Sequence, residues 1–417
     1  MSAPVLAIDF GTSNSAAAVL DGGRLRRIAI EDASDTLPTA VFFPTDRGPM
    51  RVGLAAGEAL ISGEEGRYMR ALKSVLGTGL FHEDRLIGGR RRTLADIVAA
   101  FLAHVKQRAE AKLGCSVTRV LSGRPVHFYT ADPARDARAE ADLKGCYHAA
   151  GFDDVQFLYE PEAASHAQHA RTKPGELGLV IDIGGGTSDF SVFRVTQGKT
   201  MVLASHGIRL GGTDFDHEVS MTHVMPLLGH GSKLTRVFGE GLLPVPNAIY
   251  RELATWAKIP FLYSRETERT VEDFLKHAVE PEKIALLGQV IKNHLGHELA
   301  FAVEKGKIAV NGQSPSAEIA MGLVKQGLSA PITTGSLNAA LAGFGQKLQA
   351  AMYQTLIQAK VTPDQINAAV LVGGSSLMTL VRSEVQSVLP NTRLEQADAF
   401  TAVVDGLALA TASFPLR

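Results

Sequence analysis

The stretch Asp182-Ile183-Gly184-Gly185-Gly186-Thr187-Ser188-Asp189 directly follows an apolar run at 177–181. A buried strand therefore leads into an acidic residue, three glycines, hydroxyl side chains and a second acidic residue. Glycines lack a Cβ atom, so their backbone N–H groups can close around phosphate oxygens. A carboxylate at the end of such a strand can hold a hydrated divalent cation, because Mg²⁺ prefers oxygen ligands. The stretch predicts a phosphate-binding hairpin with a metal beside it.

The same pattern occurs a second time, near the N-terminus. The apolar residues 5–8 lead into Asp9-Phe10-Gly11-Thr12-Ser13-Asn14-Ser15. Taken alone, this second stretch would fit an ordinary hairpin turn equally well. Two strand–acid–glycine–hydroxyl hairpins in two halves of one chain instead predict a duplicated fold that binds one nucleotide from both sides.

Composition indicates a globular protein with more than one core. The chain has 417 residues, of which 45% are hydrophobic and 20% are charged. This length favours two or three lobes, and this composition is unlike that of a disordered chain. The formal net charge of -1 gives no electrostatic basis for a nucleic acid or a membrane as the main partner.

The ends and the cysteines predict a cytoplasmic protein. Cys115 and Cys146 are the two cysteines, which fits a reducing compartment. The N-terminus enters a short strand almost at once, so no signal peptide is expected. No apolar run reaches the roughly 18 residues that a membrane-spanning helix needs.

Hydrophobic periodicity predicts strands and helices in both halves of the chain. In the first half, strands are expected at 5–8, 16–20, 39–43, 117–122 and 155–158, with helices at 93–113 and 132–150 and from 160 onward. In the second half, strands are expected at 179–183, 191–194, 201–206, 307–310, 317–321 and 369–372, with helices at 334–359, 377–389 and 402–412. Residues from about 217 to 305 are predicted to be mostly helical, because they show no strong strand pattern.

Five short segments occur in a characteristic order, at 9–15, 72–77, 160–161, 182–189 and 373–376. With this set the chain resembles the actin-like ATPase superfamily. It is most similar to the nucleotide-binding domain of the heat-shock protein 70 (DnaK) family, and within it to short, lid-less, YegD-like proteins. The resemblance extends over essentially the whole chain.

The resemblance implies a fold and a domain organisation. The implied fold is α/β, a duplicated actin-like (ribonuclease H-like) fold with two lobes around a central nucleotide cleft. The lobes would be residues 1–175 and 176–417, the second with a mostly helical subdomain at about 217–305. No peptide-binding domain or lid is expected, because the chain ends soon after the last ATPase helix.

The resemblance also implies roles for the residues of the two hairpins. Asp9 and Asp182 would hold Mg²⁺ through its water shell, and Thr187 would lie at the γ-phosphate and take part in catalysis. The other contacts to the nucleotide would come from Gly11, Thr12, Ser13, Asn14, Gly184, Gly185, Gly186 and Asp189.

Two further charged residues match catalytic positions of the family. Lys73 would reach the γ-phosphate and the attacking water, although a lone lysine in such a helix is usually solvated. Glu160 would bind Mg²⁺ through water or polarise the hydrolytic water. Near them, Pro125 matches the switch proline of the family, while Arg124 stands where a valine is usual.

Residues at the nucleoside end complete the implied site. A turn at Gly211 and Gly212 would close over the nucleotide, Glu304 and Lys307 match a ribose-contacting pair, and Gly373, Gly374 and Ser375 match an adenine-side loop. Ile308 and Leu377 occupy positions where many members carry arginines that stack on adenine. The sequence therefore predicts weaker adenine binding, or a base held mainly by apolar contact.

The resulting prediction is a chaperone ATPase of this family, which binds ATP or ADP with Mg²⁺ and hydrolyses ATP slowly to drive a conformational switch. A protein client or co-chaperone would be its partner. Two alternatives remain open: a small-molecule kinase of the same superfamily, and a nucleotide-dependent scaffold or filament. The histidines at 166, 169, 294 and 297 lack the spacing of a metal site, and Trp256 is predicted to be a packing residue.

Overall fold

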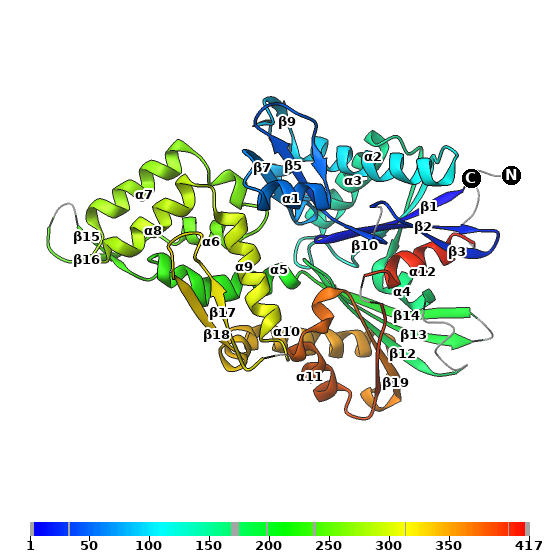
Figure 1. Ribbon diagram of the computed structural model, residues 1–417. Helices are drawn as coiled ribbons and strands as arrows, with labels where there is room; N and C mark the ends of the chain where they lie inside the picture. The colour runs from blue at the N-terminus through cyan, green and yellow to red at the C-terminus, as the bar shows by residue number, and fades with distance from the viewer. Residues whose placement is uncertain are drawn as a thin grey trace. The chain divides into compact units, whose positions relative to one another are not determined.

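The computed structural model describes residues 4–31, 34–167, 175–196, 199–236, 239–312, 314–398 and 400–412. It is a mixed α/β protein, drawn in Figure 1. The chain divides into two compact units: residues 1–212 with 345–417, and residues 213–344. In the described parts of the chain, no helix is both long enough and apolar enough to cross a bilayer.

The first sheet of the first unit is built around a central hairpin. Its strands are β1 (Val5–Phe10), β2 (Asn14–Asp21), β3 (Arg24–Ile28), β10 (Arg119–Arg124) and β11 (Asp154–Tyr159), in the order β11-β10-β1-β2-β3. β1, β2 and β3 pair antiparallel, whereas β1, β10 and β11 pair parallel. A short strand, β4 (Thr36–Pro38), also pairs with β2.

The second sheet has the same strand order and the same pairing directions. Its strands are β12 (Leu177–Ile183), β13 (Ser188–Thr196), β14 (Lys199–Ile208), β19 (Ile366–Val372) and β20 (Arg393–Gln396). Read in the same direction as the first sheet, their order is β20-β19-β12-β13-β14. The first three pair antiparallel, and β12, β19 and β20 pair parallel. Asp9 and Asp182 therefore lie one residue before the end of corresponding strands, directly ahead of the two hairpins.

Helix boundaries in the first half follow local capping signals. Helix α2 (Leu94–Leu113) begins at a capping box in which Thr93 and Asp96 bond each other's backbone N–H groups, and it ends at Gly114, whose φ is 71°. Helix α3 (Pro133–Ala149) begins after Asp132, whose side chain accepts from the N–H of Arg135. Both helices predicted in this region are confirmed.

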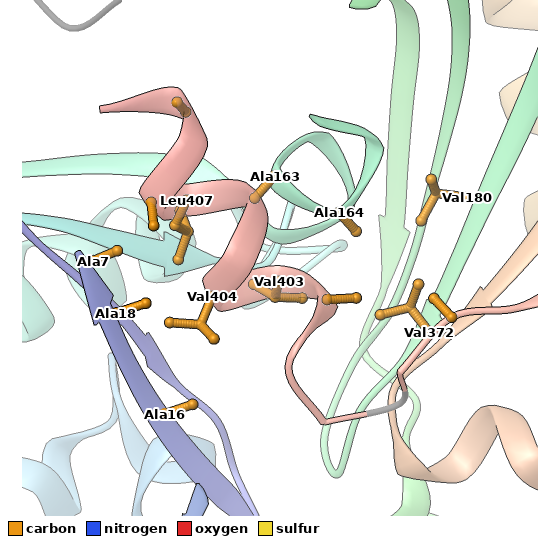
Figure 2. Close-up of a cluster of buried hydrophobic side chains, with 14 of the residues drawn as sticks. Ala7, Ala16, Ala18, Ala163, Ala164, Val180, Val372, Val403, Val404 and Leu407 are labelled. Carbon is orange, nitrogen blue, oxygen red and sulfur yellow. The ribbon is translucent and has the colours of Figure 1, made fainter. Parts of the chain in front are cut away.

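Two helices lie between the sheets and carry a hydrophobic core. α12 (Ala402–Ala410) packs on β1, β2 and β10, while α4 (Glu160–Ala167) packs on β12, β13 and β14 and against α12. Figure 2 shows the small apolar side chains that fill this layer, with Val404 and Leu407 facing Ala7 and Ala18 of the first sheet. Small residues let the two helices approach closely.

The closest approach of these helices is at Gly406. A Cβ atom on Gly406 would overlap with the backbone carbonyl of Ala163 on α4. Backbone cannot yield as a flexible side chain can, so any side chain here would push α12 away from α4. The identity of residue 406 therefore fixes the spacing of the central layer.

We expect Gly406→Ala to lower the free energy of unfolding by about 1–3 kcal/mol, because it overpacks a buried helix crossing. Denaturant unfolding followed by circular dichroism measures this. Gly145→Ala is the matched control, since Gly145 lies in α3 with open space around its missing side chain, and this change should stabilise by about 0.5–1 kcal/mol. Equal effects at both positions would contradict the steric argument.

The second unit, residues 213–344, is mainly helical. Its elements include α6 (Ala248–Leu253), α7 (Arg265–His277), α8 (Pro281–Lys292), α9 (Gly296–Ala309), and two hairpins, β15 (Lys233–Thr235) with β16 (Leu242–Pro244) and β17 (Ser316–Ala320) with β18 (Ser329–Thr333). Helices α5 (Gly212–Val219) and α10 (Thr334–Ala359) each have residues in both units.

One sequence-based prediction for this unit is confirmed and one is wrong. The region 217–305 is mostly helical, as predicted, and it also contains the hairpin β15–β16, whose strands of three residues are too short to give an alternating pattern. The segment 307–310, predicted as a strand, is the end of helix α9. The helix continues there because Gly306 packs closely on Ile319 and Lys307 pairs with a buried carboxylate.

The remaining elements complete the first unit. They are a small sheet of β5 (Ala40–Pro44), β6 (Arg51–Val52) and β7 (Gly66–Arg70), helix α1 (Leu54–Ile61), the hairpin β8 (Arg85–Ile87) and β9 (Arg90–Arg92), and helix α11 (Thr379–Val388). Among these elements the sequence predicts only β5 and α11; β6, β8 and β9 have only two or three residues each.

Candidate phosphate and metal site

The two glycine hairpins of the first unit come into direct contact. Gly184 closes the second hairpin by donating its N–H to the carbonyl of Thr187, at 3.0 Å. A Cβ atom on Gly185 would lie 2.6 Å from Oγ of Ser13 and 3.0 Å from Cβ of Thr12. Because only glycine fits at this distance, the hydroxyl residues of one hairpin face the backbone of the other.

Two further glycine turns meet at the same place. Gly212 donates its N–H to the carbonyl of Gly184, at 2.9 Å, and a Cβ on Gly211 would overlap with the backbone N of Gly186. On another side, a Cβ on Gly373 would lie 2.7 Å from Oδ1 of Asp182. The structure thus brings together the predicted turns at 184–187, 211–212 and 373–375 around one buried aspartate.

Lys73 and Glu160 form a buried ion pair in this unit. Nζ of Lys73 donates to Oε1 of Glu160 at 2.6 Å, and their side chains are only 6% and 10% exposed. Lys73 belongs to a 3₁₀ turn at Leu72–Val75, and Glu160 is the first residue of α4. The interpretation of Lys73 as a solvated surface lysine is therefore excluded.

Electrostatics keep Lys73 charged. Burial alone would lower the pKa of its ammonium group, but the carboxylates of Glu160 and Asp9 outweigh this and raise the pKa. The turn therefore presents a positive charge at neutral pH.

Three aspartates nearby have pKa values far above the usual range. Burial, with the nearby charge of Glu160, raises the pKa of Asp9 to about 7 and that of Asp189 to about 8, and the pKa of Asp182 also rises well above 3.8 for the same reasons. Asp189 accepts a hydrogen bond from the N–H of Val126 at 2.7 Å, which only partly offsets its burial.

This charge balance fits a hydrated cation. Four carboxylates share the site with a single ammonium group, so the folded protein either binds protons there or needs another positive charge. Among the residues that the structure describes, no three His, Cys, Asp or Glu side chains are grouped closely enough to hold a metal ion directly. Asp9 and Asp182 are the residues that the hairpins place beside the glycine turns.

Protonation of these acids predicts an unusual pH dependence of stability. Without metal or nucleotide, folded Asp9 and Asp189 retain protons that the unfolded chain releases above its pKa near 3.8. The folded state then binds more protons, so stability falls as the pH rises from about 4 to about 8. Asp189→Asn keeps an oxygen for the N–H of Val126 but cannot ionise, so its thermal midpoint should fall less over this range.

Thermal unfolding in a chelating buffer measures this difference. The exposed Asp84→Asn serves as the control, and its midpoint should follow the wild-type curve at every pH. A slope in Asp189→Asn as steep as that of the wild type would show that Asp189 is ionised in the folded protein.

Lys307 lies in the second unit and has a buried partner there. Its Nζ donates to Oδ1 of Asp216 at 2.7 Å, and Oδ2 of the same carboxylate accepts from Nε1 of Trp256 at 3.1 Å. Burial raises the pKa of Asp216 despite Lys307. Trp256, predicted as a packing residue, is thus buried but also has a polar role. The ribose contacts assigned to Lys307 and Glu304 stay predictions.

Sequence reasoning missed the side chains that support the site. Arg124, noted only as a departure from the family, pairs with Glu140 and Asp136 of α3 and donates to the carbonyl of Pro125 at 3.0 Å. It thereby fixes the turn whose next residue, Val126, bonds Asp189. Asp136 and Glu140 are one helical turn apart, and this spacing is the signal in the sequence that could have indicated a partner for Arg124. Of the four histidines considered for a metal site, His169 lies outside the described residues.

Part of the chain matches a known protein family. Residues 84–233 match the family model described as Hsp70 protein. The matched segment is well under half of the chain, and it contains Glu160, the second glycine hairpin and the turn at Gly211 and Gly212. Thr12, Ser13, Lys73 and the turn at Gly373 lie outside it but contact residues of the matched segment.

Proposed function

We propose that this chain, which carries an Hsp70-family, actin-like ATPase domain, binds Mg-ATP at the glycine hairpins of its first unit and hydrolyses it slowly. The family implies binding of ATP or ADP and ATPase activity in general. The observation that carries the finer proposal is the buried pair of Lys73 and Glu160 beside the two interlocked hairpins. Hydrolysis would drive a conformational switch of chaperone type.

Each group of the site has a role in this proposal. The backbone N–H groups of the hairpins would bind phosphate oxygens, with Thr12, Ser13 and Thr187 adding hydroxyl donors. Asp9 and Asp182 would hold Mg²⁺ through water, and the ion would supply positive charge that offsets the phosphates. Lys73 would stabilise the charge that develops on the transferred phosphoryl group, and Glu160 would orient the attacking water.

The matching strand orders of the two sheets support a duplicated fold. In this interpretation the hairpins β1–β2 and β12–β13 are two copies of one unit. In each copy an aspartate near the end of the first strand precedes a turn that contains glycine. The lobes at 1–175 and 176–417 and the YegD-like assignment stay proposals. A cytoplasmic location and a protein client or co-chaperone belong to the same proposal, and the absence of a disulfide between the two described cysteines agrees with a reducing compartment.

The first test separates binding from turnover. We expect Asp182→Asn to weaken magnesium-dependent ATP binding, measured by calorimetry. Lys73→Ala should still bind ATP but lose roughly 10²–10³ in kcat, because one preorganised electrostatic group is worth about this much. Unchanged hydrolysis in Asp182→Asn would exclude this site.

Lys112→Ala is the control for Lys73→Ala. It removes a lysine from the exposed end of α2 and should leave binding and kcat unchanged.

Two further assays test the alternative functions. Phosphoryl transfer to a panel of sugars and small acids would reveal a kinase, and sedimentation that depends on ATP would reveal a filament. A loss of affinity with unchanged kcat in Lys73→Ala would make Lys73 a ground-state phosphate contact.

A second test concerns the base. Leu377 follows the glycine turn at 373–375 and is 43% exposed, and Phe400, which is 48% exposed, lies against Gly374. We propose that apolar contact covers the base on this side. We expect a smaller preference for ATP over GTP than an arginine would give, since the missing cation–π contribution is about 0.5–2 kcal/mol. Leu377→Arg should tighten ATP binding by a corresponding amount in competition titrations.

Strict adenine selectivity in the wild-type protein, with a nanomolar dissociation constant, would show that other residues hold the base. Leu86→Arg is a suitable control, because Leu86 is exposed in the β8–β9 hairpin and the change adds the same charge elsewhere.

A further inference from the structure

Two guanidinium groups lie over the ring of Tyr129. The guanidinium carbon of Arg135 lies 3.9 Å from the ring centroid, and that of Arg209 lies 4.5 Å from it. Tyr129 is 7% exposed, so it is buried. Cations over the ring face are attracted by its quadrupole, so the three side chains hold one another in place.

The hydroxyl of Tyr129 reaches the turn that carries Lys73. It donates to the carbonyl of Leu76 at 2.8 Å and lies 3.3 Å from the carbonyl of Ser74. Nη2 of Arg209 donates to the same Ser74 carbonyl at 3.0 Å. Two members of the stack therefore bind the backbone directly after Lys73.

The turn needs such support because of its backbone conformation. Ala71, two residues before Lys73, has a φ of 60°. A left-handed conformation is uncommon for a residue with a side chain and persists only where its surroundings impose it. On one side Lys73 is held by Glu160, and on the other the carbonyls of Ser74 and Leu76 are held by the stack.

The stack also joins three separate segments of the first unit. Tyr129 follows β10, Arg135 lies in α3, and Arg209 lies between the end of β14 and the turn at Gly211 and Gly212. A displacement of that glycine turn would move Arg209 and, through it, the Lys73 turn.

We propose that Tyr129 is a positioning residue for Lys73, and that Arg209 makes the position of Lys73 depend on the segment leading to Gly211 and Gly212. This inference deepens the proposed ATPase function and rests on it for its effect on turnover. Its structural part, the retention of Lys73 in its ion pair, is testable without nucleotide.

Turnover gives the first test. Tyr129→Phe keeps the stacked ring and loses the hydroxyl bonds, so kcat should fall about 3- to 10-fold. Tyr129→Leu also loses the stack, and kcat should fall about 10- to 100-fold, since small displacements of a catalytic group have effects of this order. The KM for ATP should change less than about twofold in both, because the phosphate hairpins are untouched.

Tyr263→Phe is the matched control for the hydroxyl. Tyr263 also donates its hydroxyl to a backbone carbonyl, that of His294 at 3.0 Å, but belongs to the second unit. Its kcat should equal that of the wild type. If Tyr129→Leu fails to fold, the kcat of Tyr129→Phe alone decides whether Tyr129 positions Lys73. The unfolding midpoint of Tyr129→Phe is then compared with that of Tyr263→Phe.

Arg209→Gln tests the connection to the glycine turn, and Arg26→Gln is its control. Both arginines are exposed, and each donates from Nη2 to a backbone carbonyl, Arg209 to Ser74 at 3.0 Å and Arg26 to Lys112 at 3.1 Å. We expect kcat to fall about 3- to 10-fold in Arg209→Gln and to stay unchanged in Arg26→Gln.

Chemical labelling of Lys73 separates this inference from the proposed function. Acetylation by an N-hydroxysuccinimide ester, followed by mass spectrometry of the nucleotide-free protein, should show Lys73 protected in the wild type. Protection should decrease at least about 3-fold in Tyr129→Leu and Arg209→Gln, but not in the controls.

The outcomes are distinguishable. A wild-type protein without ATPase activity would end the proposed function, while the labelling would still decide whether the stack holds Lys73. Unchanged labelling together with unchanged kcat in the Tyr129 and Arg209 variants would overturn the inference. A lower unfolding midpoint with unchanged kcat and labelling would reduce the stack to a packing feature.

Discussion

The close crossing of α4 and α12 is the constraint on which the rest of the first unit depends. α12 covers one sheet and α4 covers the other, and Gly406 lets them meet backbone to backbone. Arg27 of β3 fastens α12 by two hydrogen bonds to Asp405, at 2.8 and 2.7 Å. Since α4 begins at Glu160, this layer also decides where the partner of Lys73 stands.

The site that this layer positions is electrostatically unfavourable to the fold. Taking Lys73 and Glu160 out of water costs energy that their attraction only partly returns. Asp9, Asp182 and Asp189 are buried in the same place, and burial together with the nearby charge of Glu160 raises their pKa values. A core chosen for stability alone would carry apolar residues here. Clustered perturbed groups are typical of functional sites instead.

Local patterns in the sequence were sufficient to predict the glycine hairpins and the helices with capping residues. The acid–glycine stretches predicted where β1 and β12 end, and Thr93 with Gly114 predicted the limits of α2, because these features depend on neighbouring residues. The end of α9 was predicted wrongly as a strand. Lys307 there is held by Asp216, which is distant in the sequence, so tertiary contacts rather than local preference set the structure.

The contacts that complete the candidate site were beyond local reasoning for the same reason. Lys73 and Glu160 were recognised through a resemblance, but nothing in their own segments shows that they pair. Tyr129 gave no signal at all, since a tyrosine after a strand is ordinary until two arginines from other segments enclose it.

The two sides of the Lys73 turn differ in a way that matters for a switch. On the inner side a buried ion pair resists water and salt, because screening acts weakly in a buried site. On the outer side Arg209 is exposed, and its contacts with Tyr129 and Ser74 are correspondingly weak. A turn held strongly on one side and weakly on the other can keep its charge in place while its backbone responds to a neighbouring segment.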